Sequence, residues 1–128
     1  MNLTLSVLPG SLAVCRLPAD VTIPRWIFSL PLWSLTRTED ELSLVLPEDS
    51  VLPGWKAERN WHALKVEGTL DFSLTGILSS IATPLAVAGI SIFAISTYDT
   101  DMILVKADQL VNAIHTLRDA GFKLIETE

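Results

Sequence analysis

The sequence predicts an α+β fold in which strands and helices follow one another in the order β-α-β-β-α-β. Apolar residues recur at three- and four-residue spacing in two segments of the C-terminal half, which is typical of helices with one buried face. Shorter apolar stretches rich in β-branched residues lie around these segments and favour strands. Glycines and an acidic turn separate the segments. Together these observations predict antiparallel sheets with the helices on one face.

An uncharged run over residues 72–98 decides between a membrane segment and a buried helix-strand unit. It is long enough for a membrane span, which takes about 20 apolar residues. However, Pro84 removes a backbone donor from its interior, and the β-branched and aromatic residues after Gly89 favour a strand. Aspartates flank the run, and no Lys or Arg stands at either end to set an orientation. We therefore expect a buried helix followed by a strand, and no membrane association.

The first helix occupies the first part of this run. Ser73 is its predicted N-cap and Gly89 its C-terminal stop. Pro84 does not suit a helix interior, where a proline costs about 3 kcal/mol, so we expect a bend there or a first turn that begins later. The apolar face of this helix consists of Leu74, Ile77, Leu78, Ile81, Leu85 and Ala88.

After Gly89 the pattern changes to a strand over residues 90–97. This strand is apolar on both faces, so we expect it in the centre of its sheet. The other predicted elements are strands over residues 61–66, 102–106 and 122–125, a turn over residues 98–101, and a second helix capped by Asp108 and ended by Gly121. For residues 61–128 this is the split β-α-β order of ferredoxin-like domains.

The N-terminal half is similar to a reduced copy of the same plan. A shift of 60 residues places one acidic turn on the other, and an internal duplication explains the match better than the alternative of two unrelated acidic hairpins. The aligned pairs are Thr36 with Ser96, Glu39 with Asp99, Glu41 with Asp101, Leu44 with Leu104, Val45 with Val105, and Pro24 with Pro84.

We therefore predict two domains in tandem, a reduced one over residues 1–58 and a second over residues 59–128. In the first domain we expect strands over residues 3–8 and 12–17, a short helix near residues 24–28, and a linker over residues 50–60.

Composition limits the class of partner. The 128 residues include 9 basic and 15 acidic ones, a net charge of -6, without the cluster of Lys or Arg that a nucleic-acid binder needs. Cys15 is the single cysteine, which excludes an internal disulfide and a cysteine-based zinc site and fits a reducing compartment. The apolar start of the chain lacks the basic region of a signal peptide. We expect a cytoplasmic protein without a removable leader and without a nucleic-acid partner.

The two ends of the uncharged run offer complementary groups for a free amino acid. The helix start at residues 73–76 presents backbone N–H groups to a carboxylate, and Gly76 permits a close approach. Asp99 and Asp101 can accept hydrogen bonds from an ammonium group, each worth about 1.5 to 3 kcal/mol when shielded from water. The alternative is that both aspartates only solvate a turn while Ser73 only caps a helix.

The sequence resembles a known family over nearly its whole length. Residues 84–106, with the acidic turn Ser96-Thr97-Tyr98-Asp99-Thr100-Asp101, and residues 34–45 closely resemble the ACT domains of small bacterial tandem-ACT proteins and of the CASTOR arginine sensors. The resemblance implies a regulatory module that binds a small ligand, usually an amino acid, where ACT domains meet. It implies neither catalysis nor a cofactor.

The resemblance also implies which residues hold the ligand. The first element comprises Asp71, Phe72, Ser73, Leu74, Thr75 and Gly76, and the second comprises Ser96, Thr97, Tyr98, Asp99 and Asp101. Near the helix entrance the arginine sensors have an acidic residue, whereas this chain has Leu74, so arginine specificity is not carried over. We expect a homodimer, because exposed sheet edges in a small protein invite one, and a regulated protein partner that the sequence does not identify.

Three other site chemistries are less consistent with the sequence. A magnesium ion would require more converging carboxylates than the single turn with Asp99 and Asp101 supplies. A small enzyme would rest on those aspartates with His62 and His115, neither of which lies in a nucleophile or metal motif. The four tryptophans lie mainly in the first half and the linker, where packing is favoured over an aromatic ligand cage. A module that binds a protein partner and no ligand remains the main alternative.

Overall fold

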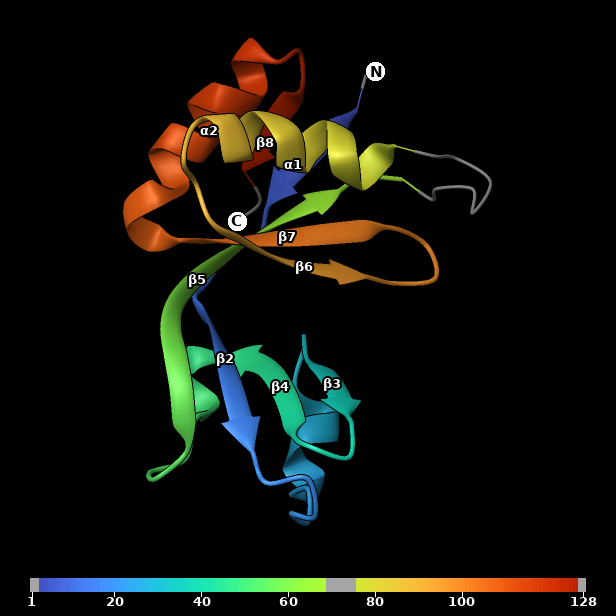
Figure 1. The fold of residues 1–128 in the computed structure, drawn as a ribbon, viewed down its shortest axis with the longest axis vertical. Coiled ribbons are helices and arrows are strands. Elements are labelled where there is room, and N and C mark those ends of the chain that lie inside the picture. Colours follow the sequence, from blue (N-terminus) through green and yellow to red (C-terminus); the bar gives the residue numbers. More distant parts are fainter. Residues whose placement is uncertain (1–2, 69–75, 127–128) are drawn as a thin grey trace. The chain divides into compact units, whose positions relative to one another are not determined.

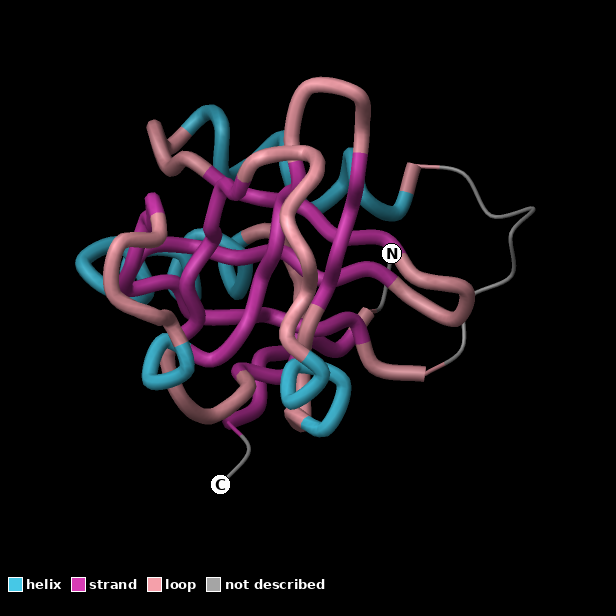
Figure 2. The backbone as a smooth tube through the Cα atoms, turned by 90° about the horizontal axis from the view of Figure 1, so that it is seen from below, coloured by secondary structure: helices cyan, strands magenta, loops and turns pink. Residues whose placement is uncertain are grey.

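The computed structural model describes residues 3–68 and 76–126, which form eight β-strands and two α-helices (Figures 1 and 2). The predicted α+β class is therefore confirmed. The strands are β1 (Thr4–Val7), β2 (Leu12–Leu17), β3 (Ser34–Arg37), β4 (Leu42–Pro47), β5 (Lys56–Val66), β6 (Ile92–Ser96), β7 (Asp101–Lys106) and β8 (Lys123–Glu126). The α-helices are α1 (Ile77–Val87) and α2 (Leu110–Asp119), and three 3-10 helices are η1 (Arg25–Ser29), η2 (Glu48–Ser50) and η3 (Ala107–Gln109).

The chain divides into two compact units. The C-terminal unit comprises Met1–Pro9 with His62–Glu128, and the N-terminal unit comprises Gly10–Trp61. Strand β1, the first in the sequence, thus belongs to the C-terminal unit. The division into domains 1–58 and 59–128 stays a prediction.

The sheet of the C-terminal unit has β1 inserted between β5 and β8. Leu5 of β1 lies opposite Val66 of antiparallel β5 and opposite Leu124 of parallel β8. On the other side of β5, β7 pairs with β5 and β6 pairs with β7. The elements predicted for residues 61–128 occur in the predicted order. However, β1, which was predicted in the first domain, lies among them, and its parallel pairing with β8 departs from the predicted antiparallel sheet.

Strand β6 corrects one prediction. Its apolar residues on both faces predicted a central strand, yet among the described residues β6 pairs with β7 alone and so forms an edge. Ile92, Phe93 and Ile95 are half-buried, and Ala94 is exposed. Apolar side chains indicate surface that a strand can bury, but they do not determine whether another strand takes up its second hydrogen-bonding edge.

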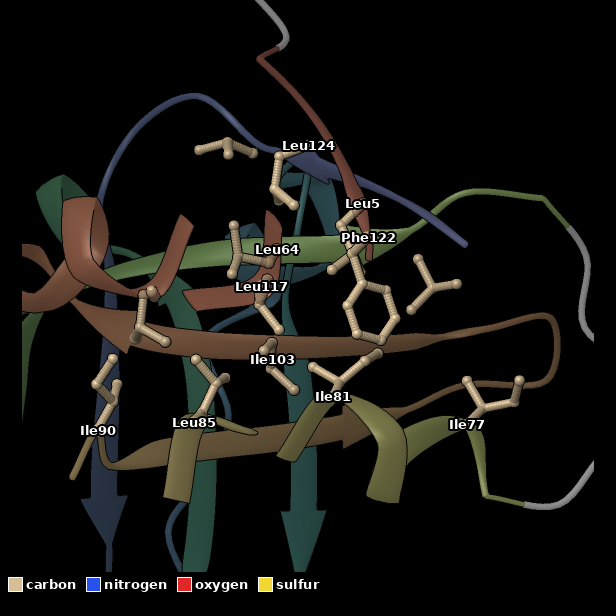
Figure 3. Close-up of a cluster of buried hydrophobic side chains, with 14 residues drawn as sticks. Leu5, Leu64, Ile77, Ile81, Leu85, Ile90, Ile103, Leu117, Phe122 and Leu124 are labelled. Atoms are coloured by element: carbon tan, nitrogen blue, oxygen red, sulfur yellow. The ribbon is translucent and has the colours of Figure 1, made fainter. Parts of the chain in front are cut away.

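Both helices cover one face of this sheet and enclose its hydrophobic core (Figure 3). The helices contribute three fully buried side chains, Ile81 and Leu85 from α1 and Leu117 from α2. These side chains point toward residues of the sheet such as Leu64 of β5 and Ile103 of β7. The remaining buried members of this core are Leu5, Val7, Val66, Ile77, Ile90, Val105, Ala113, Phe122 and Leu124. No helix in the described part of the chain has the length and apolarity to cross a membrane.

Helix α1 begins later than predicted. Its first residue is Ile77 and its N-cap is Gly76, while the predicted N-cap, Ser73, lies outside the described residues. Pro84 is inside the helix. At the other end Gly89 has φ 75°, its N–H donates to Ala86 O at 3.0 Å, and the Ile90 N–H donates to Leu85 O at 2.9 Å. This pair of bonds is a Schellman motif, which confirms Gly89 as the stop.

Helix α2 ends in the same way at Gly121, whose φ is 99°. The Phe122 N–H donates to Leu117 O at 3.0 Å, and the Gly121 N–H donates to Arg118 O at 3.0 Å. Its start differs from the prediction, because Asp108 lies within η3 and Gln109 is the N-cap residue.

In the N-terminal unit, β2 is flanked by antiparallel β4 and by the first part of β5, and β3 pairs with β4. Cys15 lies opposite both Leu44 and Ala57. Residues 56–60, predicted as linker, are therefore strand. The predicted short helix near residues 24–28 is the 3-10 helix η1, whose Ile27 is fully buried. The unit's buried core comprises Ala13, Cys15, Leu17, Ile27, Leu42, Leu44 and Leu46.

The two units repeat one hairpin at a shift of 59 residues, not the predicted 60. Strand β4 begins at Leu42 and β7 at Asp101, and η2 and η3 follow these strands at the same spacing. The register agrees, since Ser34 pairs with Val45 as Phe93 pairs with Leu104. The shift of 60 aligned identical Leu-Val pairs, but their places in the two strands differ by one residue.

Candidate functional site

The first predicted ligand element lies almost wholly outside the described residues. Five of its six residues are not described, namely Asp71, Phe72, Ser73, Leu74 and Thr75. Gly76 is described, and it is exposed, with φ 78° at the start of α1. A Cβ built on Gly76 would meet no atom of the described residues within 4 Å, apart from those of its chain neighbours.

The second element is the turn between β6 and β7. The Thr97 N–H donates to Thr100 O at 2.8 Å, and the Thr97 hydroxyl donates to the same oxygen at 3.0 Å. The Thr97 hydroxyl also accepts the Thr100 N–H at 3.2 Å. These bonds close the turn and leave Tyr98, which is 79% exposed, and Asp99 at its tip.

Asp101 lies at the base of this turn, as the first residue of β7. It pairs with Ser96, the last residue of β6, and the Ser96 hydroxyl donates to Asp101 Oδ1 at 2.6 Å. Such a bond to a carboxylate is charge-assisted and orients it. A carboxylate can accept several hydrogen bonds, so Asp101 retains acceptor capacity for a cationic ligand group.

Thr100, in the same turn, was not among the predicted ligand residues. It is 6% exposed, and its hydroxyl donates to Val66 O at 2.7 Å. This bond connects the β6–β7 turn to the last residue of β5. Spacing did not indicate this burial, because Met102, Ile103, Leu104 and Val105 are all apolar and buried, so that no alternation marks one face of β7.

The chain thus brings three features of the C-terminal unit to one end. The β6–β7 turn, the end of β5 and the first turn of α1 all lie there (Figures 1 and 3). The N-terminus of a helix and an oriented carboxylate have the two polarities that a zwitterionic molecule requires.

Other candidate chemistry has less support in the described residues. No group of three or more His, Cys, Asp or Glu side chains suited to a metal ion occurs in residues 3–68 and 76–126. His62 is half-buried in β5, and His115 is exposed on α2. Burial raises the pKa of the Cys15 thiol, which disfavours a reactive thiolate, while the charge of Arg59 acts in the opposite direction.

The tryptophans of the N-terminal unit pack mainly with other aromatic rings. Trp26 stacks on Trp55 with ring centroids 6.4 Å apart, and Phe28 contacts Trp33 edge-on at 5.1 Å. Trp26 remains 39% exposed and Phe28 54% exposed. Trp33 and Trp55 are partly buried against the core of this unit, as the predicted packing role requires, whereas burial against a partner subunit stays a prediction.

Two family models and several curated proteins match parts of this chain. The family model described as ACT domain matches residues 56–119, and a second model, described as an N-terminal domain, matches residues 10–55. The human cytosolic arginine sensor for mTORC1 subunit 1 is 34% identical over 96 residues, which cover 66% of this chain and 29% of the sensor. The curated relatives first matched are covered only to between 29% and 60% of their length.

Solved structures extend the similarity over the whole chain. An X-ray structure of an Agrobacterium tumefaciens protein is 35% identical and superposes with a TM-score of 0.93, covering 100% of this chain and 96% of that one. The regulatory subunit of aspartate kinase from Thermus thermophilus superposes with a TM-score of 0.60 at 11% identity, covering 86% of this chain and 91% of that one. The second likeness concerns the fold alone.

Proposed function

This chain belongs to the ACT-domain family, and we propose on that basis that it is a cytoplasmic regulatory protein that binds a free amino acid or a related small metabolite. Asp101 carries the proposal, because its carboxylate is oriented by Ser96 at the end of the unit where α1 begins. The relative named as an arginine sensor supports the class of ligand. We propose no catalytic step.

In the proposed complex, Asp101 accepts hydrogen bonds from the ligand ammonium group. The helix entrance, from the predicted residues Asp71, Phe72, Ser73, Leu74 and Thr75 to Gly76, receives the ligand carboxylate through backbone N–H groups. The second ligand element, the β6–β7 turn, also contacts the ligand through Thr97, Tyr98 and Asp99. Leu74 in place of an acidic residue favours a neutral amino acid over arginine.

We also propose that the chain acts as a homodimer of paired reduced and full ACT modules. The repeated hairpin at a shift of 59 residues supports the tandem origin. Strand β6 supports the dimer, because it is an edge strand with no charged residue, proline or bulge in Ile92–Ser96 to deter pairing. A ligand at the nearby turn then has a route to alter a subunit interface.

Thermal-shift screening of the twenty amino acids at millimolar concentration tests the binding function. We expect stabilisation by at least one of them, since a ligand at 100 times its Kd adds about 2.7 kcal/mol. Asp101→Asn should abolish that shift while preserving the unliganded fold. Lack of stabilisation by all twenty would contradict amino-acid binding.

The second candidate function is a structural or partner-binding module without a ligand. The uncharged edge of β6 favours it, because an edge can recruit a second chain with no contribution from the turn. A stable dimer that no amino acid stabilises would establish this candidate over the first.

A further inference from the structure

The repeated hairpin provides an internal comparison for the residues of the β6–β7 turn. At the shift of 59 residues, Thr38 corresponds to Thr97 and Asp40 to Asp99, and these residues are identical. The Thr38 N–H donates to Glu41 O at 2.9 Å, and the Glu41 N–H donates to the Thr38 hydroxyl at 3.2 Å. The C-terminal turn has the same two bonds. Threonine at this position therefore closes the turn in both units.

Ser96 and Asp101, which would orient or contact a ligand, are among the positions that differ. Ser96 corresponds to Arg37, whose guanidinium donates to Val21 O at 3.0 Å. Asp101 corresponds to Leu42, which is fully buried in the core of the N-terminal unit. The N-terminal turn is acidic, yet it has no carboxylate at the base of its hairpin. The shift of 60 concealed this difference, because it placed Glu41 on Asp101.

The turns also differ at Tyr98, which corresponds to Glu39, and at Thr100, which corresponds to Glu41. The N–H and the carbonyl oxygen of Thr100 take part in closing the turn, which leaves its hydroxyl for Val66 O. The corresponding residue of the other turn is Glu41, whose longer, charged side chain cannot replace a buried threonine hydroxyl. Only the C-terminal turn is therefore tied in this way to the strand that leads toward α1.

From these differences we infer that Thr100 is a positioning residue for the Asp101 carboxylate, which binds the ammonium group of the ligand, and that the chain has one amino-acid site, with none at the turn around Thr38–Glu41. This inference rests on the proposed function. The Thr100 hydroxyl holds the start of β7 against the end of β5, so that Asp101 keeps its place relative to the helix entrance. The N-terminal turn retains the hairpin without these recognition residues.

The test is isothermal titration calorimetry of the full chain with the amino acid that stabilises it most in the thermal-shift screen, at a temperature where every variant is folded. We expect one ligand per chain. Thr100→Val keeps the shape of the side chain but removes the hydroxyl, and it should weaken affinity at least about fivefold. Thr100→Ser should restore affinity to within about twofold, which a loss of packing alone would not predict.

Matched variants of the N-terminal turn are the controls. Thr38→Val removes the turn-closing hydroxyl that corresponds to that of Thr97, and Asp40→Asn removes the aspartate that corresponds to Asp99. Each variant should leave affinity within about twofold of the wild type. Two ligands per chain, weaker binding after Asp40→Asn, or unchanged binding after Thr100→Val would overturn the inference while leaving the proposed function intact. Absence of binding by the wild type would overturn both.

Discussion

Ser96 and Asp101 face each other across the last pair of the β6–β7 hairpin, and the Ser96 hydroxyl donates to the Asp101 carboxylate at 2.6 Å. The corresponding pair in the other unit is Arg37 and Leu42, which have neither a free carboxylate nor a hydroxyl. One hairpin geometry thus supports two different surfaces. The chemistry of the site depends on which residues occupy the base of the turn.

Ser96→Ala should weaken amino-acid binding by about three- to tenfold, because the Asp101 carboxylate loses the hydrogen bond that orients it. The effect should be smaller than that of Asp101→Asn, which removes the charge itself. Calorimetric titration measures both. Ser91→Ala, at an exposed position before β6, is the control and should bind as the wild type does. Equal binding by Ser96→Ala would show that the carboxylate needs no such partner.

Ala94→Lys should prevent dimer formation if two β6 edges pair. Ala94 is exposed on this strand, and a symmetric antiparallel pair centred on it would place two lysine charges opposite each other. Light scattering after size-exclusion chromatography measures the mass. Val111→Lys, at an exposed position on α2, should leave the mass unchanged. A dimer that survives Ala94→Lys would require another interface.

Leu117→Ala should lower the free energy of unfolding by about 2–5 kcal/mol, because this side chain of α2 is fully buried between the helices and the sheet. Urea denaturation measures the loss. On the same helix Val111 is 65% exposed, so Val111→Ala should cost less than about 0.5 kcal/mol. A similar loss in both variants would contradict the packing described for α2.

Gly89→Ala should cost about 1–2 kcal/mol, because the residue after α1 adopts φ 75°, where a Cβ is unfavourable. The control Ala86→Ser lies at an exposed position of the same helix and should cost less than about 0.5 kcal/mol. Thermal unfolding of both variants decides whether the conformation at Gly89, or merely a change near the helix end, causes the loss.

Stability should decline at high pH in a manner that depends on Cys15. Burial raises the pKa of its thiol above the ordinary value of 9.0, so the folded state holds the proton more tightly than the unfolded state. The contribution of the protonated Cys15 thiol to the free energy of unfolding is complete below pH 9.0 and is lost as the pH rises through the folded-state pKa. Denaturation of wild type and Cys15→Ala between pH 7 and 10 should show a steeper decline in the wild type. Parallel curves would exclude this linkage.

The sequence by itself determined the local elements of the C-terminal unit. The three- and four-residue spacing of apolar residues indicated α1 and α2, and Gly89 and Gly121 marked where these helices end. Both signals are local, because a helix face and a Schellman motif involve residues within a few positions of each other. The acidic turn and its Asp101 were likewise evident from a short stretch of sequence.

Only the tertiary structure decided which strands are neighbours. The insertion of β1 between β5 and β8, the edge position of β6 and the repeat register of 59 residues all depend on pairings between distant segments. Periodicity states which face of a strand is apolar, but it does not identify the partner at either edge. The Thr100 hydroxyl is the clearest case, since its acceptor, Val66 O, lies 34 residues earlier and only the fold brings the two together.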